Sequence, residues 1–273
     1  MTDYRLGIVG CGHMGEAILK GVLDSSFLNA GQIVFIEKNK SRKEHITGKY
    51  KISAAKDITE LVKGSSYIFL AVKPQDLKSV LMEIKKSFSC KKNTIISIAA
   101  GVPTYYIEEI LNLNASVIRI MPNAPALFGS GMAAVSSGRF TKNADLLFSE
   151  KLINSVGDYV YIDEKFQNIA TALSGSGPAY FFLFCKYLIE AGIKNGLNEE
   201  ISRKLIAGTM IGAGIAIEKS GEEMDRLIKK VASPGGTTEK ALEEFDRSKL
   251  DEIITRAVES AKKRAYELQE LLD

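Results

Sequence analysis

The sequence of 273 residues predicts an α/β protein in two parts: a Rossmann-type doubly wound sheet, followed by an all-α C-terminal domain. In the first part, short β-rich apolar runs alternate with helix-like stretches, as parallel strands and crossover helices do. A glycine-rich segment follows the first of these runs. After about Asp163 the β-rich runs stop, and long helical stretches bounded by glycine replace them. The predicted domains are residues 1–163 and 164–273.

Apolar runs define the predicted strands of the first domain. The run at residues 68–72 has no polar alternation, which is typical of a strand covered by helices on both faces. We therefore expect helices on both sides of the sheet. The predicted strands are residues 5–10, 33–36, 67–72, 94–99 and 116–121.

Helix signals dominate the second domain. Pro178 suits a first helical position before the apolar run 179–188, Gly196 suits its end, and Asn198 is expected to cap the next helix. A last amphipathic helix is expected at residues 250–271. Small residues on one helix face let another backbone approach closely, either within the subunit or from a second subunit. Such residues recur at four-residue spacing: Gly208, Gly212 and Ala216.

Composition excludes several functional classes. The 36 basic and 33 acidic residues give a net charge of +3 and are spread along the chain, which argues against a nucleic-acid partner. Cys11, Cys90 and Cys185 lack the spacing of a disulfide framework or a zinc site, so we expect no metal and a reducing, cytoplasmic compartment. No apolar run reaches the roughly 18 residues of a membrane span, and we expect no membrane partner.

The glycine-rich segment predicts a dinucleotide site. In a G-x-G-x-x-G loop between strand and helix, the first glycine permits a tight turn and the second lets a pyrophosphate approach the backbone. The third glycine lets the helix pack closely on the strand, and the first amides of the helix can donate hydrogen bonds to the phosphates. The segment reads Gly10, Cys11, Gly12, His13, Met14, Gly15.

The residues after the second strand give conflicting signals about the cofactor. Glu37 stands where an acid binds the adenosine ribose and selects NAD. Lys38 and Asn39 follow it, and a cluster of cations that could hold a 2′-phosphate continues from there. Its further members are Lys40, Arg42 and Lys43.

Other strand ends are candidate cofactor contacts, because ligands of doubly wound sheets bind beyond the carboxyl ends of the strands. Lys73 is either a charge near the nicotinamide or a solvated strand end. Asn123 either binds the cofactor or stabilises an Asn-Ala-Pro turn. The candidate residues are Ala71, Val72, Lys73, Pro74, Ala99, Ala100, Gly101 and Asn123.

The second domain has no histidine, which argues against dehydrogenases built around a histidine base. It has two loops rich in Gly, Ser and Thr, at residues 173–178 and 233–238, each before a helix. Successive amides at a helix start can hold a carboxylate, although the loop at 233–238 also reads as an ordinary helix cap.

These segments together resemble pyrroline-5-carboxylate reductase, nearly end to end. The resemblance implies reduction of 1-pyrroline-5-carboxylate to L-proline by NAD(P)H, as the last step of proline biosynthesis. It also implies that residues 1–163 are a dinucleotide-binding domain and residues 164–273 a dimerisation and substrate-binding domain. The expected assembly is a homodimer, with dimers often built into larger rings. The segments that carry it are 10–15, 71–74, 97–102, 121–125, 173–180 and 231–238, of which the last two are the most specific.

Carried over by position, the resemblance assigns the substrate site. Ser233, Gly235, Gly236 and Thr237 would hold the substrate carboxylate, and Thr238 would hydrogen-bond the ring nitrogen as the catalytic donor. A protonated C=N bond accepts hydride readily, so this chemistry needs positioning and one donor more than a strong base.

Two departures from the family pattern stand out. Glu37-Lys38-Asn39 replaces the family's usual Asn-Arg-Ser or similar, and Lys230 replaces an Asp or Asn. Because the loop after the second strand has more cations than anions, we expect NADP as cofactor, with NAD usable.

Two other functions compete with this prediction. A β-hydroxyacid dehydrogenase relative would need a catalytic lysine after the domain boundary, for which Lys186 and Lys194 are candidates by position. A non-catalytic sensor of NAD(P) would use the glycine loop, but the loop at 233–238 would then have no role.

Overall fold

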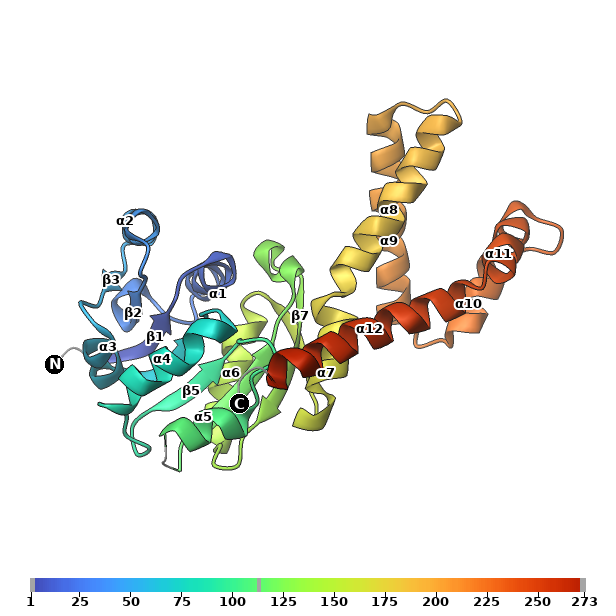
Figure 1. Ribbon diagram of the computed structural model, residues 1–273. Coiled ribbons are helices and arrows are strands. Elements are labelled where there is room, and N and C mark those ends of the chain that lie inside the picture. Colours follow the sequence, from blue (N-terminus) through green and yellow to red (C-terminus); the bar gives the residue numbers. More distant parts are fainter. Residues whose placement is uncertain (1–2, 112–113, 271–273) are drawn as a thin grey trace. The chain divides into compact units, whose positions relative to one another are not determined.

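The computed structural model describes residues 3–111 and 114–270. Its contacts divide the chain into two compact units, shown in Figure 1. Unit 1 comprises Met1–Ser176 and Ala261–Asp273, and unit 2 comprises Gly177–Ser260. The end of the last helix therefore packs with the first unit.

Unit 1 contains an eight-stranded sheet in the order β3-β2-β1-β4-β5-β6-β7-β8. Neighbouring strands are parallel except β6 and β7, which are antiparallel. The strand order reverses between β1 and β4, as in doubly wound folds, and the predicted fold class is confirmed. The strands are β1 (Tyr4–Val9), β2 (Ile33–Ile36), β3 (Ser53–Ala54), β4 (Ser65–Leu70), β5 (Thr94–Ser97), β6 (Ser116–Met121), β7 (Gly131–Ser137) and β8 (Gly157–Tyr161).

The sheet is covered on both faces because successive side chains of a strand point to opposite sides. Ile8 belongs to one buried apolar cluster and Val9 to the other. The first cluster includes residues of α1 (His13–Asp24), α2 (Lys40–Tyr50) and α6 (Asn143–Asn154). The second includes residues of α3 (Ile58–Gly64), α4 (Pro74–Lys85) and α5 (Thr104–Leu111). Helices on both faces were expected from the run at 68–72, and this is confirmed.

The strands differ from the prediction at their ends. β4 and β5 each end two residues before the predicted ends at Val72 and Ala99, and β1 ends at Val9 rather than Gly10. Gly10 has a positive φ of 84°, which turns the chain out of the sheet. The prediction missed β3, β7 and β8. β3 has two residues, and β7 consists mostly of small residues that lack the β-branched pattern.

Short helical turns complete unit 1. The 3-10 helix η1 (Ala30–Gln32) precedes β2, and η2 (Ala124–Phe128) lies between β6 and β7. After β8 the chain continues through η3 (Glu164–Phe166), the helix α7 (Gln167–Ala170) and a π-helical turn η4 (Thr171–Gly175). π-helical turns are rare and occur frequently at functional sites.

Unit 2 is helical, as predicted. Its helices are α8 (Gly177–Lys194), α9 (Glu199–Ser220), α10 (Met224–Val231), α11 (Thr237–Arg247) and the first half of α12 (Leu250–Glu270). Asn198 caps α9 as expected, because its Oδ1 accepts the N–H of Ile201 at 2.8 Å. Gly196 ends the α8 segment with a φ of 97°. Residue 271 of the predicted last helix lies outside the described residues.

Apolar side chains of unit 2 are widely exposed. Phe182 is 66 % exposed and Ile211 64 %. At Gly208 and Gly212, an added Cβ would meet no described atom within 4 Å. Within the part of the chain that the structure describes, the small-residue face of α9 therefore has no packing partner at these positions.

Candidate active site

The three loop glycines differ in what surrounds them. An added Cβ at Gly10 would lie 2.9 Å from the carbonyl oxygen of Ala71, and at Gly15 it would lie 2.7 Å from that of Gly10. Gly10 and Gly15 are thus required by close backbone packing. At Gly12, a Cβ would meet no described atom within 4 Å. The loop backbone at Gly12 is therefore open to a phosphate, as the G-x-G-x-x-G pattern requires.

The other loop residues contribute backbone rather than reactive side chains. The Cys11 side chain is fully buried, and burial raises the pKa of its thiol to about 12. Such a thiol stays protonated and unreactive at neutral pH. His13 is exposed at the first position of α1, and Met14 packs partly against the core.

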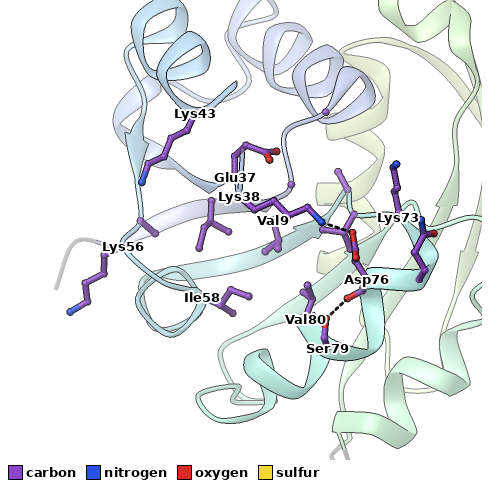
Figure 2. A pocket seen from close by; sticks show the side chains of 17 residues that line it. Val9, Glu37, Lys38, Lys43, Lys56, Ile58, Lys73, Asp76, Ser79 and Val80 are labelled. Carbon is purple, nitrogen blue, oxygen red and sulfur yellow. Dashed lines mark hydrogen bonds and ion pairs between the residues drawn. The ribbon is translucent and has the colours of Figure 1, made fainter. Parts of the chain in front are cut away.

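A cavity of about 750 Å³ opens beside this loop, at the carboxyl ends of β1, β2 and β4 (Figure 2). This is where doubly wound sheets bind ligands. The structure brings together seven of the predicted cofactor residues here: Gly10, Gly12, Glu37, Lys38, Ala71, Val72 and Lys73. Residues that the prediction missed also line it, among them Lys56, Ile58, Gln75, Asp76, Ser79 and Val80.

Glu37 connects the glycine loop to the turn after β2. Its Oε2 accepts the N–H of Cys11 at 2.8 Å, and its Oε1 accepts the N–H of Asn39 at 2.9 Å. Asn39 is the N-cap of α2, and its Oδ1 accepts the N–H of Arg42 at 3.0 Å. The side chain of Asn39 therefore stabilises the helix start and does not line the cavity.

The cations after β2 have different partners. Lys38 Nζ lies 2.9 Å from Asp76 Oδ2, and this hydrogen bond raises the pKa of Lys38. Arg42 instead holds the glycine loop: its Nε donates to the Cys11 carbonyl at 2.7 Å, and its Nη2 donates to the Gly12 carbonyl at 3.2 Å. Lys43 lines the cavity on another side from Asp76 (Figure 2).

Glu16 of α1 is the centre of a polar cluster below the loop. It pairs with Arg42 and accepts hydrogen bonds from Lys49 at 2.9 Å and Tyr50 at 2.7 Å. Burial acts to raise the pKa of Glu16, but the hydrogen bonds from Lys49 and Tyr50 and the charge of Arg42 outweigh it and lower the pKa to about 2. The cluster ties α1 to α2 and fixes Arg42 against the loop.

Several predicted cofactor residues lie outside the lining of this cavity. Pro74 is the first residue of α4, and Ala99, Ala100 and Gly101 follow β5. A Cβ at Gly101, where φ is 76°, would lie 3.4 Å from Leu268 of α12. Asn123 joins the end of β6 to η4, because its Oδ1 accepts the N–H of Met132 at 2.9 Å and its Nδ2 donates to Ser174 Oγ at 3.3 Å.

The loop at 233–238 belongs to unit 2 and begins α11. The N-cap is Gly236, with no side-chain hydrogen bond, so the expected alternative of a Ser or Thr cap is not what the structure contains. Thr237 and Thr238 are the first two residues of the helix. Gly235, with φ of 71°, donates its N–H to the Glu239 carboxylate at 2.7 Å. This amide thus binds a carboxylate within the chain itself.

The structure shows neither a membrane-spanning helix nor a metal cluster among its described residues. Among residues 3–111 and 114–270, no helix has both the length and the apolar character of a membrane span. Over the same residues, no three His, Cys, Asp or Glu side chains gather as a metal ion would require.

Comparison with known proteins defines the class first. Residues 5–101 match the family model described as NADP oxidoreductase, coenzyme F420-dependent, and residues 164–268 match the one described as pyrroline-5-carboxylate reductase dimerisation. A glycine loop with an adjoining cavity, together with these two matches, identifies the chain as a nicotinamide-dependent oxidoreductase.

The particular family follows from relatives that match over nearly the whole chain. The pyrroline-5-carboxylate reductase of Mycobacterium leprae is 32 % identical to this chain, and the match covers 97 % of this chain and 97 % of that protein. The one of Arabidopsis thaliana is also 32 % identical, and the match covers 98 % of this chain and 96 % of that protein. A solved structure of the Plasmodium falciparum enzyme with NADP bound has a TM-score of 0.88 and 30 % identity, covering 98 % of this chain and 99 % of that one. The chain belongs to the pyrroline-5-carboxylate reductase family.

Family membership confirms the resemblance inferred from the sequence, together with the enzyme class. It argues against the β-hydroxyacid dehydrogenase alternative. Lys186, a candidate base in that alternative, is 62 % exposed and lies 3.8 Å from Glu190 on the same helix.

Proposed function

We propose that this chain reduces 1-pyrroline-5-carboxylate to L-proline with a hydride from NAD(P)H, the last step of proline biosynthesis. The observation that carries the proposal is the start of α11. There the amide of Gly235 already binds a carboxylate, and two threonines are the first two residues of the helix, after its glycine N-cap. This chemistry suits a small cyclic imino acid in a chain of this family.

The cofactor would lie along the carboxyl edge of the sheet. Its pyrophosphate would approach Gly12 and the start of α1, within the loop formed by Gly10, Cys11, Gly12, His13, Met14 and Gly15. When bound, the nicotinamide supplies the hydride. The other residues proposed to contact it are Glu37, Lys38, Asn39, Ala71, Val72, Lys73, Pro74, Ala99, Ala100, Gly101 and Asn123.

NADPH is the proposed preferred cofactor, with NADH usable. Four lysines line the cavity against two acids, Glu37 and Asp76, which gives an excess of positive charge toward a 2′-phosphate. The lysines are Lys38, Lys43, Lys56 and Lys73.

In the substrate site, Ser233, Gly235, Gly236 and Thr237 would hold the carboxylate. Thr238 would donate a hydrogen bond to the ring nitrogen as that atom gains its lone pair during hydride addition. Hydride addition at the carbon of a protonated C=N bond gives a secondary amine, and the electron pair of the broken π bond stays on nitrogen. The role of Thr238 is therefore to orient the ring and stabilise the developing amine, without acting as a strong base.

The proposed working unit is a homodimer, which could be built into a larger ring. The exposed apolar surface of unit 2 supports it. The proposed domain division is 1–163 and 164–273. Three free cysteines are in keeping with a reducing, cytoplasmic location.

The test is steady-state oxidation of NADPH with 1-pyrroline-5-carboxylate, using Thr238→Val and Thr238→Ser. Removing a hydrogen-bond donor used mainly in the transition state should lower kcat by about 10² to 10³ and change KM less. Thr238→Ser keeps the hydroxyl and should keep most of the rate. If folded Thr238→Val binds NADPH normally and turns over near the wild-type rate, Thr238 is not the donor.

A further inference from the structure

The ion pair between Lys38 and Asp76 crosses the proposed adenosine pocket. Lys38 follows β2, and Asp76 lies in the first turn of α4, so the pair joins segments 38 residues apart in sequence (Figure 2). Both residues line the same cavity. A group that binds between them must interact with both charges.

Lys38 stands out among the cations near this pocket. Arg42 is bound to two glycine-loop carbonyls and to Glu16. Lys43 and Lys56 lie across the cavity from Asp76 (Figure 2). Lys38 is next to Glu37, at the position where doubly wound enzymes recognise the adenosine ribose.

We propose that Asp76 sets the preference between NADPH and NADH by competing with the 2′-phosphate of NADPH for Lys38. The inference rests on the proposed binding of NAD(P)H at this cavity. A 2′-phosphate carries about 1.5 to 2 negative charges at neutral pH, so it takes Lys38 from Asp76 and is repelled by the carboxylate left behind. The 2′-hydroxyl of NADH leaves the ion pair intact.

The exposure of the pair determines the size of the effect. The Lys38 side chain is 82 % exposed and that of Asp76 is 39 % exposed. Exposed ion pairs are weak because water screens them. Asp76 therefore reduces NADPH affinity without abolishing it, and we expect a factor of about two to five.

A purely structural role of Asp76 is distinguishable from this one. An acid in the first turn of a helix stabilises it through the helix dipole, and Asp76→Asn weakens that interaction in α4. Such a loss affects folding and affects all adenosine ligands alike. Glu83→Gln is a matched control, because Glu83 is an exposed acid of the same helix, paired with Lys86 and outside the cavity lining.

The experiment is calorimetric titration of the full chain with adenosine 2′,5′-bisphosphate and with 5′-AMP, so that no catalysis is required. In Asp76→Asn, the bisphosphate should bind about two to five times more tightly, and 5′-AMP should bind as in the wild type. In a Lys38→Met background, Asp76→Asn should give a smaller gain, because only the direct repulsion between Asp76 and the 2′-phosphate is left to remove. Glu83→Gln should change neither ligand. In the steady state, the KM of Asp76→Asn for NADPH should fall while kcat stays unchanged.

Three results would overturn the inference. The first is that Asp76→Asn does not bind the bisphosphate more tightly, and the second is that it binds both ligands more tightly by the same factor. The third is that the gain in bisphosphate affinity persists in full with Lys38→Met, which would indicate simple repulsion between Asp76 and the 2′-phosphate. If neither ligand bound the folded wild-type chain, the cofactor site itself would be wrong. The substrate proposal stands or falls separately, on the Thr238 variants.

Discussion

Arg42 is the residue whose replacement most sharply separates loop positioning from phosphate recognition. From the sequence it is one of several cations that could bind a 2′-phosphate. In the structure its guanidinium donates to the carbonyls of Cys11 and Gly12 and pairs with Glu16. The side chains of Arg42 and Glu16 are 25 % and 16 % exposed, so water screens this contact less than it screens Lys38 and Asp76.

Arg42→Met keeps the aliphatic stem and removes the donors. A hydrogen bond that involves a charged group is worth about 1.5 to 3 kcal/mol, and the 2.7 Å bond to Cys11 is the better formed of the two. Since the contributions do not add, we expect a total loss of about 2 to 3 kcal/mol. If half of this loss falls on cofactor binding, KM rises about tenfold, because 1.4 kcal/mol corresponds to a factor of ten. The rest should appear as a lower free energy of unfolding.

The assay is KM for NADPH and for NADH, with urea unfolding of the same samples. Both KM values should rise by the same factor, because the pyrophosphate loop is common to the two cofactors. Lys40→Met is the control, since Lys40 is an exposed cation of the same helix, two residues away. A rise confined to NADPH would show that Arg42 reads the 2′-phosphate, and unchanged KM and stability would refute the loop-positioning role.

Three further predictions follow from other parts of the structure. Gly12→Val should fold normally, because an added side chain there meets open space, but it should lose measurable NADPH binding. Gly15→Val should fail to fold, because its Cβ would lie 2.7 Å from the Gly10 carbonyl oxygen. Normal NADPH affinity in Gly12→Val would contradict the proposed site. Because the pKa of Glu16 is lowered from 4.5 to about 2, its ionised carboxylate stabilises the fold fully at pH values above 4.5. This stabilisation is lost as the pH falls from 4.5 toward 2. Glu16→Gln should therefore cost about 1 to 2 kcal/mol at pH 7, less than half of that at pH 3 and little at pH 2, measured by urea unfolding. A cost independent of pH would exclude the linkage. Light scattering at micromolar concentration should show a dimer or a larger assembly, whereas an active monodisperse monomer would rule out the proposed assembly.

Local patterns in the sequence predicted the features that depend on neighbouring residues. The apolar run at 68–72 predicted a strand buried on both faces, and Asn198 was correctly predicted as a helix cap. Contacts between distant segments were not predictable in this way. The bonds from Cys11 to Glu37 and from Lys38 to Asp76 span 26 and 38 residues, and they depend on how β1, β2 and β4 align in the sheet. Asp76 was missed for this reason.

Carboxylates of the chain itself bind donors at each proposed anion-binding position. Glu37 accepts the amide of Cys11 in the glycine loop, Asp76 binds Lys38, and Glu239 accepts the amide of Gly235. An unpaired donor is costly where water is excluded, so an internal carboxylate keeps such a donor satisfied and oriented. Each of these acids also competes with the ligand for that donor. Because the pairs are exposed or partly buried, the competition is weak, and it adjusts affinity while the donor geometry is retained.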